Sequence, residues 1–284
     1  MLTNLTKYFS LIFFLFFLTN YSWANLLITP NRVVIEGNQR SKSVILINTS
    51  NQTSTYQLHW TQKRQMPDGR FTNLPPESDE VRKASSLLKF SPHQFTLSPN
   101  KKQTVRIILK DKKNLKKGEF RSHLTFQPAS DLDKNDYPFN MGPPQQNQLQ
   151  QSFSIPVTIR QGKINASANI TSINLRKTVL YMGKIAYNVK VTLSGTGENT
   201  AIGRLKALWK NKMKSEFNTI GASNNIVLYP ESNSITFQIH LNIQNLSSGY
   251  MKITYEGTGE FLGTTFSELE IPVTLSDFKF ENLE

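Results

Sequence analysis

The 284-residue chain contains no cysteine. Disulfide bonds are therefore excluded as a source of stability, and so is a cysteine nucleophile. A folded protein of this composition must be held together by buried apolar side chains. The chain is long enough for two domains of ordinary size, about 100 to 150 residues each.

Long hydrophobic runs are also missing. The longest apolar stretch, Leu11–Leu18, is less than half of the roughly 20 residues that a membrane-spanning helix needs. It follows Lys7 and precedes Ser22 and Ala24, which form a small-x-small pattern typical of a secretory signal peptide. We therefore expect residues 1–24 to be a cleaved signal peptide, and the mature chain to be exported and soluble without membrane insertion.

Acidic residues are few, with 20 Asp and Glu against 33 Lys and Arg, and the formal net charge is +13. The densest basic stretch is KDKKNLKK, Lys110–Lys117. Nucleic-acid sites commonly combine basic residues with aromatic side chains that stack on bases. This stretch has no aromatic residue and lies between two strand patterns, so we expect a solvated loop or attraction to acidic partners, and no nucleic-acid binding.

Patterns for catalysis are absent as well. The chain has four histidines, and none of them has metal-ligand spacing. No serine lies in a nucleophile-elbow motif. The sequence therefore predicts a protein that is not an enzyme and that uses no metal or other cofactor.

What the sequence does contain is a series of short apolar patterns with a period of two, separated by Asn, Gly, Pro, Ser and Lys clusters. Such patterns predict strands joined by turns. No window of a dozen residues up to Arg160 shows a helical stripe, which disfavours crossover helices and a parallel sheet. We expect an all-β fold built from antiparallel β-sandwiches. The patterns in the first half are LLITPNRVVIEG, SVILINTS, STYQLHW, LLKFSP, QTVRIIL, EFRSHLTF and FSIPVTIR.

Two long polar stretches interrupt the first half. The first, Thr61–Ser86, is expected to be a connection with a turn at Pro67–Gly69. The second, Ala129–Gln151, is rich in Asp, Asn, Gln and Pro and predicts a loop longer than an ordinary hairpin turn. Strand patterns resume after a short joint, so a second all-β domain is expected to start near Lys163.

One strand pattern, GEFRSHLTF, has charge on one face. Glu119, Arg121 and His123 lie on the face opposite the apolar residues Phe120, Leu124 and Phe126. A solvated face is the usual explanation in an antiparallel sheet with one wet side. A binding surface is the alternative.

Three stretches, taken in order, resemble the periplasmic chaperones of the chaperone-usher pilus pathway. They are ITPNRVVIEG, SKSVILINTSNQTSTYQLHW and FSPHQFTLSPNKKQTVRIIL. Most such chaperones carry an Asp-Arg-Glu-Ser pattern where this chain has GEFRSH, which resembles the alternate or archaic branch. The resemblance covers the first domain and only the all-β character of the second.

This resemblance implies two immunoglobulin-like antiparallel β-sandwich domains in an L or boomerang arrangement, at residues 25–162 and 163–284. It also implies a chaperone of pilus assembly in the periplasm. Such a protein binds and caps pilus (fimbrial) subunits by donor-strand complementation, in which it contributes a strand to an incomplete sandwich, and delivers them to an outer-membrane usher.

A donor strand needs apolar side chains at every second position and an accessible edge. The stretch from 149 to 160 has this pattern, with one apolar face formed by Leu149, Phe153, Ile155, Val157 and Ile159. Alternation alone also fits an ordinary core strand of the first domain, and this alternative stays open.

A donated strand also needs a fixed register, because a slip of one residue turns every apolar side chain away. The resemblance implies that a basic cleft binds the C-terminal carboxylate of the subunit and sets this register. Arg32 matches the position of the family's cleft arginine. Classical members add a lysine near the start of the last strand of this domain, but this chain has Ser154 or a neighbour there.

Arg121 is our candidate for the second cation, provided that its strand faces the groove between the domains. The alternative is an ion pair of Arg121 with Glu119 or Glu36 on a wet surface. Arg160 and Arg106 are interpreted as structural or interdomain charges.

A secreted structural or adhesive sandwich, such as a pilus component, is the competing interpretation. Such a protein would polymerise or bind a surface, whereas a chaperone would form a soluble one-to-one complex.

Overall fold

The computed structural model describes residues 26–36, 38–111, 115–129, 151–180, 183–212, 216–243 and 248–280. These residues form β-strands and short 3₁₀ turns, with no α-helix among them. Accordingly, the described part of the chain holds no helix that could cross a membrane. The predicted all-β class is confirmed.

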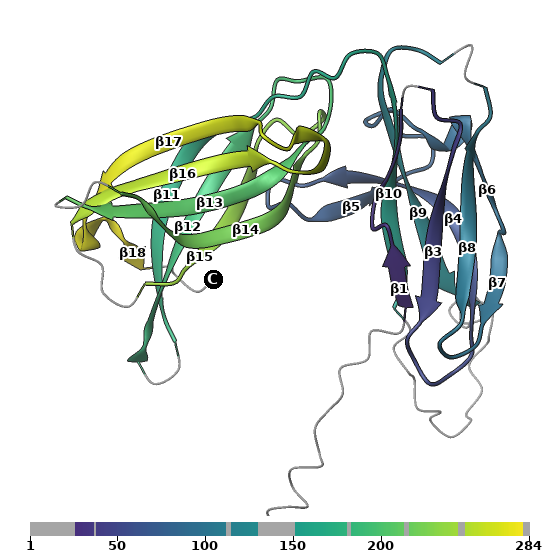
Figure 1. Ribbon diagram of the computed structural model, residues 1–284, viewed down its shortest axis with the longest axis horizontal. Coiled ribbons are helices and arrows are strands. Elements are labelled where there is room, and N and C mark those ends of the chain that lie inside the picture. The colour runs from purple at the N-terminus through teal and green to yellow at the C-terminus, as the bar shows by residue number, and fades with distance from the viewer. Residues whose placement is uncertain are drawn as a thin grey trace, which may run out of the picture.

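The first half of the chain forms a two-sheet sandwich (Figure 1). One sheet has the order β1-β3-β8-β6, and the other has the order β2-β10-β9-β4-β5, with β7 paired to β4. The strands are β1 (Leu26–Thr29), β2 (Val33–Glu36), β3 (Ser41–Asn48), β4 (Ser54–Gln65), β5 (Phe71–Leu74), β6 (Leu88–Ser91), β7 (Gln94–Leu97), β8 (Lys102–Leu109), β9 (Gly118–Pro128) and β10 (Phe153–Gln161).

The second half forms another two-sheet sandwich, with orders β15-β12-β11-β18 and β14-β13-β16-β17. The two sandwiches meet at an angle, and β5 extends from the first toward the second (Figure 1). The strands are β11 (Asn169–Val179), β12 (Ile185–Ser194), β13 (Ala201–Asn211), β14 (Asn218–Leu228), β15 (Ile235–Leu241), β16 (Gly249–Gly257), β17 (Thr265–Val273) and β18 (Lys279–Phe280).

Each sandwich has its own apolar core, as expected for alternating strands whose inner faces pack together. The first core includes Leu46, Ile107 and Phe126, and the second includes Val191 and Tyr255, all of them at most 1% exposed. Stability without disulfides is thus consistent with two separate buried cores.

The first predicted strand is in fact two strands. Pro30 interrupts the pattern LLITPNRVVIEG, and β1 pairs with β3 in one sheet while β2 pairs with β10 in the other. Proline has no N–H group for a ladder, which favours such a break. The pairing of β2 with β10 is parallel, an exception to the antiparallel prediction.

The polar stretch Thr61–Ser86 also differs from its prediction as a plain connection. It contains the end of β4 and all of β5, which pair from Gln62–Leu74 to Gln65–Phe71. The expected turn at Pro67–Gly69 is confirmed, with the Gly69 N–H donating to the Met66 carbonyl at 2.8 Å. The result is a hairpin that reaches the second sandwich.

Candidate functional site

The charged face of β9 is not exposed to solvent. Glu119, Arg121 and His123 are 6%, 3% and 3% exposed, because the second sandwich and the β4–β5 hairpin cover them. Of the two interpretations, the solvated face does not apply to these residues. This face of the β2-β10-β9-β4-β5 sheet belongs to the joint between the two sandwiches.

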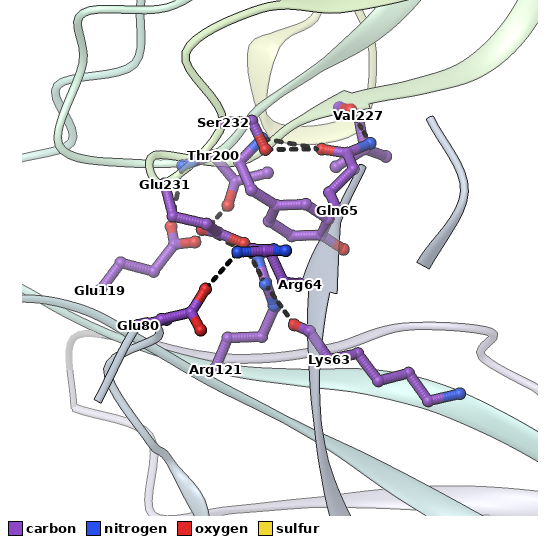
Figure 2. Close-up of polar contacts among 11 residues, drawn as sticks. Lys63, Arg64, Gln65, Glu80, Glu119, Arg121, Thr200, Val227, Glu231 and Ser232 are labelled. Carbon is purple, nitrogen blue, oxygen red and sulfur yellow. Dashed lines mark hydrogen bonds and ion pairs between the residues drawn. The ribbon is translucent and has the colours of Figure 1, made fainter. Parts of the chain in front are cut away.

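Arg121 forms an ion pair with Glu231 of the second sandwich (Figure 2). It also donates to the Lys63 carbonyl at 3.0 Å, and its guanidinium lies 3.5 Å from the ring centroid of Tyr229. The predicted alternative partners, Glu119 and Glu36, do not bind it. Since Arg121 is buried and already paired, we withdraw it as an anchor for an external carboxylate.

Arg160 is a second interdomain cation, as predicted. It is 3% exposed and donates to Glu119 at 2.9 Å and to Glu260 of the second sandwich at 2.8 Å. Burial alone would lower the pKa of Arg160, but Glu119 and Glu260 raise it above its ordinary value. Glu119 in turn accepts hydrogen bonds from the N–H and hydroxyl of Thr200. Arg106 is different, because it lies exposed on β8 and donates to the Ser41 hydroxyl at 3.3 Å.

The β4–β5 hairpin adds neutral hydrogen bonds to this joint. The Gln65 side chain donates to the Val227 carbonyl at 2.9 Å and accepts from the Ser232 hydroxyl at 3.3 Å (Figure 2). The Pro67 carbonyl accepts from the Thr236 N–H at 2.8 Å. These residues were not predicted from the sequence, although a PDGR turn between two alternating stretches indicates a hairpin.

His123 is buried against Phe71, with ring centroids 5.5 Å apart. Its Nδ1 has no hydrogen-bond partner among the residues that the structure describes. Burial lowers the pKa of His123 to about 3, and the nearby charges of Arg121 and Lys63 lower it in the same direction. The folded protein therefore keeps this ring neutral at any mildly acidic pH.

This neutral histidine predicts acid sensitivity. Because its folded pKa lies below its unfolded value of about 6.5, the unfolded chain binds the proton first as pH falls. The contribution of neutral His123 to the free energy of unfolding is complete above pH 6.5 and declines as the pH falls toward 3. Between pH 6 and 4.5 we expect His123 to account for a loss of about 2 kcal/mol. In denaturant unfolding, His123→Phe should remove this part of the pH dependence, and an unchanged pH profile would contradict the assignment.

The outer edge of β10 is open at its start. β2 pairs only with Val157 to Arg160. Within the described residues, no strand pairs with the same edge of Phe153–Pro156, while β9 pairs along the full length of the other edge. An unpaired strand edge is a template for a further strand.

Three of the predicted donor side chains are core residues. Ile155, Val157 and Ile159 are 4%, 0% and 1% exposed and pack in the first core. The alternative interpretation applies to them, because they cannot leave the core while the sandwich stays closed. Phe153 is only partly buried, at the margin of the core. Leu149 lies outside the described residues.

Arg32 lies directly before β2, at the end of this open edge. Val33 pairs with Val157, so Arg32 is next in register to Pro156. Arg32 is half-buried, and it makes no hydrogen bond or ion pair with any described residue. It lines a cavity together with Glu36, Lys42 and Glu260.

The charge of Arg32 affects the pKa of Glu260, which lies in the second sandwich. Burial raises the pKa of Glu260, but Arg160 and then Arg32 bring it below its ordinary value. The structure thus places one unpaired guanidinium at the point where the open edge of β10 ends. No group of three or more His, Asp or Glu side chains that could hold a metal ion occurs in the described part of the chain.

No family model matches the chain, and no curated protein matches it either. Many of the solved structures that match it are chaperones of the chaperone-usher pilus pathway. The class 5 fimbriae chaperone CfaA is 13% identical, with a TM-score of 0.41, over 88% of this chain and 100% of that chain. The Pseudomonas aeruginosa CupB2 chaperone is 14% identical, with a TM-score of 0.40, over 88% and 100%.

A chain of the CsuC-CsuE complex, a chaperone with a tip adhesion subunit of archaic Csu pili from Acinetobacter baumannii, is also similar. It is 18% identical, with a TM-score of 0.37, over 75% of this chain and 90% of that chain. A likeness of this degree does not assign a function, so the function has to be argued from the site.

Proposed function

We propose that this protein is a periplasmic chaperone that binds pilus subunits by donor-strand complementation and delivers them to an outer-membrane usher. The observation that carries the proposal is the open edge of Phe153–Pro156 with the unpaired Arg32 at its end. The resemblance of the first-domain stretches to pilus chaperones supports the same role. The boundaries 1–24, 25–162 and 163–284 for signal peptide and two domains are part of this proposal.

The geometry favours one orientation for an incoming strand. β2 already occupies the outer edge of β10 from Val157 onward and runs parallel to it. A partner strand that lies parallel in the open part of the edge has to end where β2 begins. Its C-terminal carboxylate would then meet Arg32, whose planar guanidinium can bind both carboxylate oxygens.

The apolar side chains on one face of β10 could complete a sandwich that lacks one strand. Ile155, Val157 and Ile159 belong to the core of the first sandwich, and Phe153 continues the same face out of it. A subunit lacking one strand exposes core side chains and unpaired backbone groups along a groove. We propose that Phe153 and the residues before it, including Leu149, fill this groove, while the three buried residues support the strand.

The proposal is tested by recovering the chain, tagged at its C-terminus, from the envelope of its own source and counting what co-purifies. We expect one β-rich partner per chain. Arg32→Ala should weaken binding about 10- to 100-fold, because a charge-assisted contact to the carboxylate is lost. Arg106→Ala is the matched control, since Arg106 is exposed on the other sheet.

Recovery of the chain alone would contradict the proposal. Recovery as a self-polymer that forms equally well with Arg32→Ala would contradict it too. That result would instead support a structural or adhesive sandwich.

A further inference from the structure

The hairpin of β11 and β12 extends past the other strands of its sheet in the described part of the chain. β15 pairs with β12 only as far as Tyr187, and β18 pairs with β11 only up to Lys177. Beyond these residues the two hairpin strands pair only with each other, and they end at Val179 and Ile185. The end of the hairpin therefore projects from the second sandwich, on the side away from the joint (Figure 1).

Exposed apolar side chains cluster at this projecting end. Val179, Leu180 and Ile185 are 55%, 51% and 46% exposed. Val179 and Ile185 are opposite one another in register, so their side chains lie on the same face of the hairpin. Phe280, at the end of β18, is 57% exposed and pairs in register with Lys177, two residues before Val179. Apolar side chains that gather on one projection indicate a contact site.

All the charged side chains of the hairpin are basic. The sequence has no Asp or Glu from Tyr137 to Gly197. Asp277, shortly before β18, accepts hydrogen bonds from Thr274. Within the described residues, no acidic side chain forms an ion pair with the four cations next to the exposed apolar group, which are Arg176, Lys177, Lys184 and Lys279. A negatively charged surface would therefore meet these cations with little competition from carboxylates.

The size and shape of the projection favour a bilayer over a folded protein as the partner. Stable protein interfaces use roughly 20 to 30 residues on each side, and the hairpin beyond Lys177 and Tyr187 is far shorter than that. The residues from Thr178 to Leu180 span about 10 Å as extended chain. This length is close to the depth of about 5 to 10 Å that apolar side chains reach at the boundary between lipid headgroups and acyl chains. Backbone groups on the outer edges of the hairpin stay in the hydrated headgroup region, so they need no further strand.

We propose that the end of the β11–β12 hairpin binds the surface of a bilayer rich in anionic lipids. Val179, Leu180, Ile185 and Phe280 enter the boundary between headgroups and acyl chains, and the surrounding basic side chains contact lipid phosphates. The contact is peripheral and reversible. This inference goes beyond the proposed function and does not depend on it, because the hairpin and the open edge of β10 lie in different sandwiches.

The test mixes the full mature chain with vesicles of phosphatidylcholine, alone or with an equal share of phosphatidylglycerol, and measures the bound fraction by sedimentation. We expect binding only to the anionic vesicles, weakened at least about tenfold when the salt concentration rises from about 0.1 to 0.5 M. Val179→Asp should weaken binding at least about tenfold, and Lys184→Ala about fivefold. The matched controls are Leu262→Asp and Lys89→Ala, which change exposed side chains elsewhere and should leave binding unchanged.

Both Asp variants are expected to fold, because Val179 and Leu262 are exposed. Spin-labelled lipid in the anionic vesicles should broaden the amide signals of Gly183 and Ile185 before those of the first sandwich. Equal binding by Val179→Asp and Leu262→Asp would overturn the proposal, and so would equal binding to neutral and anionic vesicles. Self-association or capture of a protein partner that Val179→Asp abolishes, without any vesicle binding, would assign the hairpin to protein docking and overturn the lipid contact.

Discussion

Replacing Glu231 with alanine is expected to lower the free energy of unfolding by about 3 to 5 kcal/mol. Arg121 is 3% exposed, and Glu231 is its only acidic partner among the described residues. Without Glu231, the guanidinium must stay buried and uncompensated, or the two sandwiches must separate to hydrate it. Either outcome costs stability, because a buried charge without a partner is expensive.

The measurement is urea unfolding followed by the fluorescence of Trp60, which packs on the first core, and of Trp209, which packs on the second. Variants with one of these tryptophans each report on one sandwich. Glu231→Ala should lower the midpoints and separate the two transitions. Glu80→Ala is the control, because Glu80 pairs with Arg64 at a half-exposed site and should cost less than about 1 kcal/mol. Equal effects of the two changes would contradict this account of the joint.

Introducing a charge at Phe153 is the second change with a large expected effect. Phe153→Asp should weaken binding of a co-purified partner at least about 100-fold, because it removes apolar burial and places a carboxylate in an apolar groove. The variant should fold, since Phe153 is only partly buried in the free chain.

Titration of the purified partner against the variant measures this effect. Leu27→Asp is a matched control, because Leu27 is 51% exposed on β1, at an edge of the other sheet. Unchanged binding by Phe153→Asp would mean that the partner does not use this edge.

Strand patterns were predictable because alternation depends on neighbouring residues alone. The face of a side chain follows from the same alternation, and Glu119, Arg121 and His123 do share one face. What covers that face depends on residues far away in sequence, such as Glu231, which lies 110 positions after Arg121. For this reason the sequence left a solvated face and a binding surface open as alternatives.

The donor strand shows a related limit. Ile155 and Phe153 obey the same alternation, yet one is buried in the core and the other is at its margin. Periodicity cannot show where along a strand the core ends.

Amide hydrogen exchange of the first sandwich, free and with its co-purified partner, tests the central claim most directly. Among Phe153, Ser154 and Ile155, the N–H groups that point to the open edge should exchange faster in the free chain than the N–H groups of Val157–Arg160 that point to β2, and Pro156 has no N–H. Partner binding should slow exchange of these edge-facing N–H groups, because a new strand pairs there. Unchanged exchange at this edge, with protection elsewhere on the molecule, would contradict strand donation by β10.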